Sequence, residues 1–181
     1  MIRLIFFLAL LLSGPALRAA DAATHLDDPG QLLPADAAWA KSLDAKLGAF
    51  ERTAGIRVVV QIHLRAPAAE EDKEPGAYMR ALATKLGVIK HGVLAVYFAD
   101  DPDWRVWIGD ELTPAFTGKA GTAKEFTESG AMHEAKEAFL KETFVKADAA
   151  FAALPKGTPA QKLALQTDAL VAGLIARLAP R

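Results

Sequence analysis

Two short segments rich in β-branched residues constrain this fold more than any other feature of the sequence. They are residues 56–64 (IRVVVQIHL) and residues 92–99 (GVLAVYFA). Both are short and nearly continuously apolar, which is typical of strands buried on both faces of a sheet. Between them, residues 75–87 carry apolar side chains four positions apart and end in glycine, a helical pattern. This order predicts a right-handed crossover between two parallel strands.

A third strand is predicted over residues 104–108. Asp100–Asp103, with proline at a position that suits a turn, joins it to the second strand as a hairpin. Alternation along this strand places Trp104 on one face and Arg105 and Trp107 on the other.

Helices are predicted on either side of these strands from apolar residues at spacings of three and four, over residues 34–55, 122–154 and 160–178. The last two are expected to pair as an antiparallel hairpin, and residues 110–121 are expected to be a loop. The fold class is therefore α/β. We expect a three-layer α/β/α sandwich with a small central mixed sheet, plus a C-terminal helical hairpin. Residues 23–120 would form the α/β domain, and residues 121–181 a helical extension packed on that domain.

The N-terminus has the pattern of an export signal. Arg3 precedes an apolar run from Leu4 to Leu12, and a Ser-Gly-Pro break and small residues follow. The run is shorter than the roughly 20 residues that a membrane span needs; a buried N-terminal helix is the alternative. We expect cleavage between Ala19 and Ala23, so that residues 1–22 are removed. In a Gram-negative host the mature chain would be soluble in the periplasm, without a membrane span.

Composition excludes several classes of protein and site. The chain has no cysteine, so disulfides, thiolate metal sites and cysteine nucleophiles are ruled out. The formal net charge is −1, and without a run of Lys and Arg we expect no nucleic-acid partner. The common dinucleotide, phosphate-loop, zinc-protease and serine-hydrolase motifs are missing from the sequence. Composition and motifs therefore point to no particular enzyme class.

An acidic turn follows the second buried strand. It contains Asp100, Asp101 and Asp103, and ligands favour the carboxyl ends of strands in open α/β sheets. Several carboxylates there could hold a hard cation such as calcium or magnesium, but Asp and Pro are equally typical of a solvated turn. The four histidines share no metal-ligand spacing, so each is expected to be an ordinary surface or hydrogen-bonded residue: His25, His63, His91 and His133.

The order of these segments resembles the TPM domain family. The resemblance rests on Asp28–Leu33, on residues 53–60, on Gly92–Leu94 running into Asp100–Asp101, and on Arg105–Gly109. It extends over about residues 26–113. It implies an exported or lumenal α/β/α sandwich. Members of the family have been connected with calcium binding, acid phosphatase activity and the maintenance of membrane protein complexes.

The sequence departs from the family pattern at several positions. Lys90 and His91 stand where the family has Asp-Asn, and a cation there should repel a metal ion. Pro102 stands where the family has arginine. Glu111 replaces a glycine that permits positive φ, so the loop around it is expected to be rebuilt. The membrane-spanning segment that usually follows the domain in bacterial members is also absent from this sequence.

The resemblance leaves two functional hypotheses. The favoured one is an exported TPM-like module that acts by binding, as an accessory factor with a protein partner in the cell envelope. The alternative is a metal-dependent, acid phosphatase-like hydrolase in which Asp28, Asp100 and Asp101 hold calcium or magnesium. Asp103 or Glu111 would replace the missing family acid. A further option is that the two C-terminal helices dock a partner through an apolar face.

Overall fold

The computed structural model describes residues 24–180, and residues 1–23 and 181 lie outside the described part. The predicted export signal and its cleavage point therefore fall outside it. The elements in chain order are β1 (Leu26–Asp27), α1 (Ala37–Ala54), β2 (Arg57–His63), α2 (Ala77–Lys85), β3 (Gly92–Phe98), β4 (Asp103–Ile108), a 3₁₀ turn η1 (Asp110–Leu112), α3 (Thr113–Thr117), α4 (Ala123–Glu128), α5 (Ala131–Ala152) and α6 (Pro159–Leu178).

The sheet is mixed and its strands follow the order β1-β2-β3-β4. Strands β1, β2 and β3 are parallel, and β4 returns antiparallel to β3. The register pairs Val59 with Leu94 in the parallel part and Tyr97 with Trp104 in the hairpin. The predicted parallel crossover and the hairpin are thus confirmed. The two-residue strand β1 is an addition that no sequence pattern predicts.

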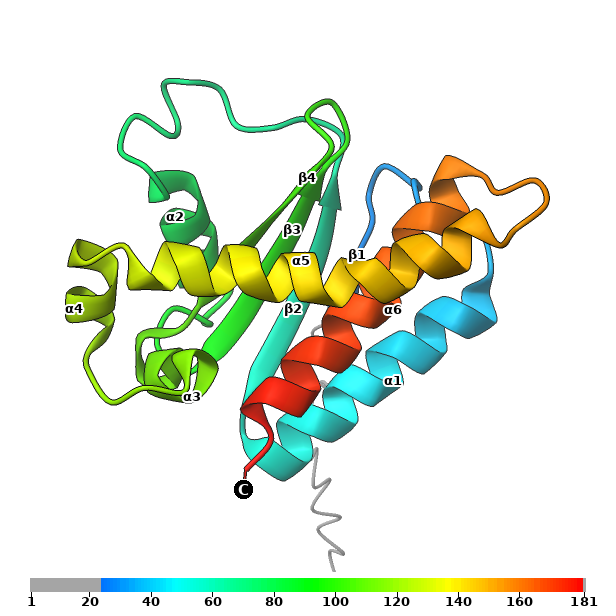
Figure 1. Cartoon of the computed structure of the whole chain (residues 1–181). Helices are drawn as coiled ribbons and strands as arrows, with labels where there is room; N and C mark the ends of the chain where they lie inside the picture. Colours follow the sequence, from blue (N-terminus) through cyan, green and yellow to red (C-terminus); the bar gives the residue numbers. More distant parts are fainter. Residues whose placement is uncertain (1–23, 181) are drawn as a thin grey trace, which may run out of the picture.

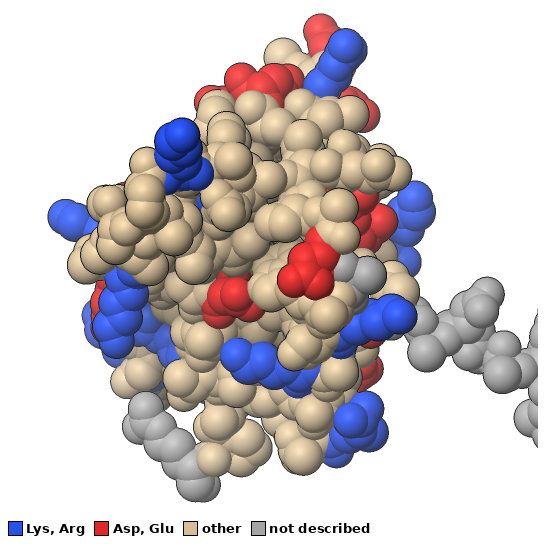
Figure 2. All heavy atoms as spheres, turned by 90° about the vertical axis from the view of Figure 1, so that its right-hand side faces the viewer, with Lys and Arg blue, Asp and Glu red and all other residues tan. Residues whose placement is uncertain are grey.

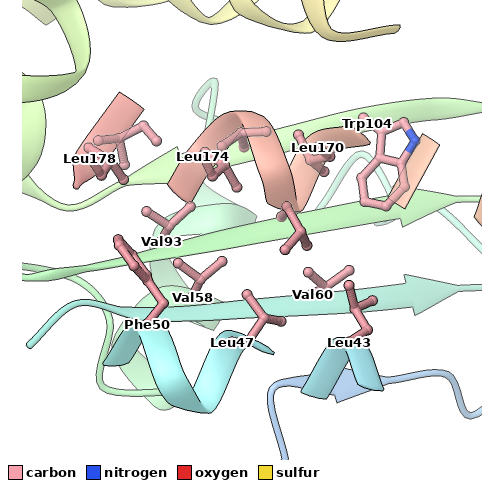
Figure 3. Close-up of a cluster of buried hydrophobic side chains, with 14 of the residues drawn as sticks. Leu43, Leu47, Phe50, Val58, Val60, Val93, Trp104, Leu170, Leu174 and Leu178 are labelled. Atoms are coloured by element: carbon pink, nitrogen blue, oxygen red, sulfur yellow. The ribbon is translucent and has the colours of Figure 1, made fainter. Parts of the chain in front are cut away.

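Alternation along the strands divides the core into two clusters, one on each face of the sheet (Figure 1). One face packs against α1, α3, α5 and α6. Its side chains come from Val58, Val60, Val93 and Trp104, among others, and α1 and α6 supply leucines (Figure 3). The other face packs against the nine-residue α2, through side chains that include Val59, Leu94 and Phe98. The expected α/β/α layers are therefore present, and the side formed by α2 is much the thinner.

Helix α1 has clear start and stop signals. The side chain of Asp36 accepts hydrogen bonds from the amides of Ala38 and Trp39, and Gly55 ends the helix with φ 71°. The predicted apolar face is confirmed, with its leucines and phenylalanine buried: Leu43, Leu47 and Phe50. A Cβ on Gly48 would lie 3.5 Å from the His25 ring, an ordinary contact distance, so α1 runs directly beside His25.

The predicted single helix over residues 122–154 is wrong in one respect, because the chain breaks at Gly130. That residue has φ 76° and separates α4 from α5. Thr122 and Glu125 cap α4 reciprocally, which gives the short helix its own start. The predicted helix also ends too late, since Leu154 lies beyond α5 and is 39% exposed. Residues 110–121 are not simply loop, since they contain η1 and α3.

Helix α6 belongs to the same core as the sheet. Its side chains Leu170, Val171 and Leu174 are fully buried beside strand residues. The indole Nε1 of Trp39 donates to Asp168 Oδ2 at 2.8 Å, which ties α1 to α6. Helix α5 packs on the outer side of α6, as the predicted helix pair requires (Figure 1). No helix in residues 24–180 is long and apolar enough to cross a membrane.

Candidate functional site

The connections after β1 and β2 leave the sheet toward opposite faces. The first leads to α1 on the thick side, and the second leads to α2 on the thin side. Open α/β sheets bind ligands at the carboxyl ends of their strands, where such connections part. Leu64 lies at this edge with 56% of its surface exposed. A Cβ on Gly30, in the loop after β1, would come within 2.9 Å of Leu64 Cγ, so the two loops meet there.

A chain of hydrogen-bonded side chains crosses this edge on the α2 face. Gln61 Nε2 donates to Asp27 Oδ2 at 3.2 Å, and Gln61 Oε1 lies 3.2 Å from His63 Nε2. His63 Nδ1 in turn lies 3.2 Å from the hydroxyl of Tyr78, on α2. Gln61 is only 8% exposed, so its amide needs both partners. The four residues come from β1, β2 and α2 and are joined only by the fold.

With a neutral His63 ring, one set of donors and acceptors satisfies all the hydrogen bonds from Asp27 to Tyr78. Because the Gln61 amide nitrogen donates to Asp27, its oxygen faces His63, and His63 Nε2 must then carry the hydrogen. His63 Nδ1 is left as an acceptor for the Tyr78 hydroxyl. All donors therefore point from Tyr78 toward Asp27, and His63 is a neutral imidazole in this arrangement.

The environment of the chain shifts the pKa values of two of its members. Burial lowers the pKa of His63 below 6.5, and the negative charge of Asp27 partly opposes this. Burial also raises the pKa of Tyr78 above 10.0, with Glu71 adding to the rise and Arg105 acting against it. The lowered pKa of His63 favours the neutral ring of that arrangement.

The segment between β2 and α2, residues 64–76, covers part of this chain. Asp72 Oδ2 accepts a hydrogen bond from Arg105 Nη1 at 3.1 Å, and Asp72 Oδ1 accepts from the amide of Tyr78 at 3.1 Å. The guanidinium of Arg105 also lies over the ring of Phe98, 5.0 Å from its centroid. Arg105 therefore joins the covering segment to the aromatic side chains around His63.

Two of the three aspartates predicted as the main metal ligands accept backbone hydrogen bonds. Both oxygens of Asp28 accept backbone hydrogen bonds, from Leu32 at 3.0 Å and Leu33 at 2.8 Å. Asp100 Oδ1 accepts from the amide of Ala66 at 2.7 Å. Asp101 and Asp103 are exposed in and beside the β3–β4 turn, as a solvated turn would place them. Within residues 24–180, no three His, Asp or Glu side chains are grouped so that they could hold a metal ion.

Glu111 and Lys90 lie at the other end of β3 from the acidic turn. The amide of Glu111 donates to the carbonyl of Lys90 at 3.0 Å, just before β3 begins at Gly92. A seven-residue strand is about 20 Å long, so Glu111 cannot share an ion with Asp100. For the same reason Lys90 cannot repel a cation held at the acidic turn. The glutamate faces His91 instead, at 3.3 Å.

Sequence reasoning misses the residues that the fold brings together at this edge. The histidine spacing predicts an ordinary residue at His63, and no motif marks Asp27, Gln61 or Tyr78. One signal does exist: alternation along β2 places Gln61 and His63 on the same face of an otherwise apolar strand. The partners of these two residues lie in other segments of the chain, so no sequence spacing could indicate them.

Two surface hollows lie away from the hydrogen-bonded side chains. An open groove of about 580 Å³ runs between α5 and α6, beside Phe139 and the small residues Ala172, Gly173 and Ala176. A second hollow of about 470 Å³ lies along α2, next to Pro75 and Arg80. Both are open to solvent, and neither includes a member of the chain from Asp27 to Tyr78.

Comparison with known proteins shows similarity at the level of fold. No protein-family profile matches the sequence, and no curated protein matches it. Among solved structures, the chain is similar to the N-terminal domain of a protein from P. gingivalis, determined by NMR in solution. The TM-score is 0.57 at 18% sequence identity, and the match covers 88% of this chain and 87% of that chain. The chain therefore shares its α/β architecture with that bacterial domain.

Proposed function

We propose that this chain is an exported binding module that recognises a protein partner in the cell envelope through the carboxyl edge of β1, β2 and β3. The observation that carries the proposal is the polar chain from Asp27 to Tyr78, placed where the connections after β1 and β2 part toward opposite faces. Exposed Leu64 lies at the same edge and offers an apolar contact beside these polar groups. Resemblance to the TPM domain family supports an exported accessory role.

The charge of the edge indicates what kind of partner would fit. The loops 28–36, 64–76 and 99–102 together contain eight Asp and Glu but only two Lys and Arg. Figure 2 shows acidic side chains at the upper margin of the molecule, with a basic one beside them, on the side to which these loops extend in Figure 1. A partner segment that carries Lys or Arg would be steered toward such an edge, and binding would weaken with salt.

Site-specific photo-crosslinking in the native envelope tests this proposal. A photoreactive residue at Leu64 is expected to capture a specific partner, and one at Val145 is the matched control, because Val145 is also an exposed aliphatic residue (63%) but lies on α5. The adduct at Leu64 should weaken in the Asp100→Asn, Asp101→Asn variant and at high salt. Equal capture at both positions would contradict the proposal, and so would capture at Leu64 that does not change with salt or with the two substitutions.

The metal-dependent hydrolase is distinguished by turnover. The carboxylates of Asp28 and Asp100 accept backbone hydrogen bonds that hold their loops, and within residues 24–180 no group of three acidic or histidine side chains is placed to hold an ion. The binding proposal predicts no hydrolysis of p-nitrophenyl phosphate with calcium or magnesium. Metal-dependent turnover that is lost in Asp101→Ala would establish the hydrolase instead.

A further inference from the structure

His25, immediately before β1, is a buried histidine between two carboxylates of α1. The residue is 8% exposed, and its Nε2 lies 2.7 Å from Glu51 Oε2. Its Nδ1 lies 3.4 Å from Asp44 Oδ1, and its backbone amide donates to that same oxygen at 2.6 Å. Its carbonyl accepts from the amide of Val60, on β2, at 2.7 Å. His25 therefore connects β1 to both α1 and β2.

The Nδ1 atom of His25 is buried and has no hydrogen-bond partner within residues 24–180. If the ring is neutral and Nε2–H donates to Glu51, the lone pair of Nδ1 faces an oxygen of Asp44, and the two repel. If the ring carries a second proton, Nδ1–H faces that oxygen, and the contact becomes a charge-assisted attraction. One proton thus changes the sign of the contact between β1 and α1.

The charged groups around the ring come mainly from α1. Besides Asp44 and Glu51, Arg52 lies close, since a Cβ on Gly48 would be 3.3 Å from Arg52 Nη1 and 3.5 Å from His25 Cε1. Strand β2 meets His25 through the backbone of Val60. The other titratable histidine connected to β1 is His63, which reaches Asp27 through Gln61.

Strand β1 is short, and apart from the packing of Leu26 on the core it is held by few contacts. It contains two residues, paired only with Val60 and Gln61 at the edge of the sheet. One of the two is Asp27, which accepts the hydrogen bond from Gln61 at the end of the polar chain. Any loosening of β1 would therefore move the terminal acceptor of that chain.

We propose that His25, Asp44 and Glu51 form a proton-operated clasp on β1. With the second proton the clasp holds β1 and Asp27 against the sheet, and without it the strand opens locally. The effect on partner binding rests on the proposed function, whereas the clasp itself does not.

Amide hydrogen exchange measured by NMR on the full chain tests the clasp. The amides of His25 and Val60, corrected for intrinsic rates, are expected to be protected about tenfold more at about pH 5 than at about pH 8, because the second proton turns the contact between Nδ1 and Asp44 from repulsive to attractive. The measurement is made in a His63→Gln background, so that the other histidine does not titrate. Leu174, in the core of α6, is the internal control and should show no such difference.

Two variants separate the clasp from general stability. His25→Gln should abolish the pH dependence at Val60. If that variant does not fold, Asp44→Asn takes its place: it keeps an acceptor for the His25 amide and should reduce the pH dependence. Equal protection at both pH values, or a pH dependence that persists in His25→Gln, would overturn the clasp. If the clasp is present but crosslinking at Leu64 does not change with pH, the link to binding fails and the clasp stands.

Discussion

At the amino end of β3 the chain is closed by its own backbone, whereas at the carboxyl end the loops are held largely by side chains. Gly109 and Glu111 donate backbone hydrogen bonds to Gly92 and Lys90, at 2.8 and 3.0 Å. At the other end, Asp28 holds the loop after β1, and Asp100 holds the loop after β2. Backbone closure depends on shape, while side-chain closure depends on charge and protonation. The comparison indicates that the side chains whose hydrogen bonds a partner could alter are concentrated at the carboxyl end of the sheet.

Gly109→Ala should have the largest effect, because it attacks the backbone closure directly. A Cβ at this position would collide with the carbonyl group of Lys90 and come within 2.9 Å of the Gly92 nitrogen. Backbone must move to relieve this contact, so we expect a loss of about 3 kcal/mol in the free energy of unfolding. The midpoint of urea denaturation measures it.

Gly118→Ala is the control for that substitution. Gly118 has φ 68°, but a Cβ at this position would meet no atom within 4 Å, so only the backbone conformation is strained, at about 1 kcal/mol. Similar losses in the two variants would show that the amino end is not a tight closure.

Gln61→Leu tests the polar chain at the carboxyl end. The substitution removes the donor to Asp27 and the acceptor for His63, and it places an apolar side chain of similar size in the buried position. We expect a loss of about 1–2 kcal/mol, since two partly buried polar groups lose a partner. Chemical denaturation measures the loss, and crosslinking at Leu64 should fall at the same time. Unchanged crosslinking would show that the hydrogen-bonded side chains from Asp27 to Tyr78 are not part of the binding surface.

Acidification should lower the free energy of unfolding through His63, at the carboxyl end of β2. Because burial lowers the pKa of His63 in the folded protein below its value of 6.5 in an exposed chain, the unfolded state takes up the proton first. The stability that His63 contributes is complete above about pH 6.5 and is lost as the pH falls below that value. The difference in unfolding free energy between wild type and His63→Gln, measured from pH 8 to 5, isolates this effect from the other histidines. A difference independent of pH would contradict the neutral, partly buried imidazole.

Asp72→Asn should have the smallest effect on stability. The pair of Asp72 and Arg105 is partly exposed, with 22% and 30% of the side-chain surfaces accessible, so we expect a loss of less than about 1 kcal/mol. Cleavage by a protease within residues 64–76 should nevertheless become faster, because this pair fastens the segment to β4. Unchanged cleavage would show that Asp72 does not hold the segment.

The strands are predictable from the sequence because their composition leaves few alternatives. Residues 57–63 contain three consecutive valines and an isoleucine, residues 92–98 are almost entirely apolar, and both are strands. The break between α4 and α5 escapes prediction because one glycine stands between two stretches of good helix formers, where an interior glycine is tolerated. Strand β1 escapes it because two residues show no periodicity.

The candidate site is less predictable for a topological reason. The acidic residues near the family-like segments are neighbours in sequence, but Glu111 and Asp100 lie at opposite ends of β3. Conversely, Asp27 and Tyr78 are far apart in sequence, and Gln61 and His63 join them. Only the parallel order of β1 and β2 brings these residues together, and that order depends on a strand too short to recognise.

Hydrogen exchange at the two ends of the sheet tests the central comparison most directly. The amides of Gly109 and Glu111 are expected to exchange only with global unfolding, and those of Leu33 and Ala66, bonded to Asp28 and Asp100, are expected to exchange through local opening. Faster exchange at Leu33 and Ala66, by at least about tenfold, is the predicted result. Equal protection at both ends, or faster exchange at Gly109 and Glu111, would contradict the account.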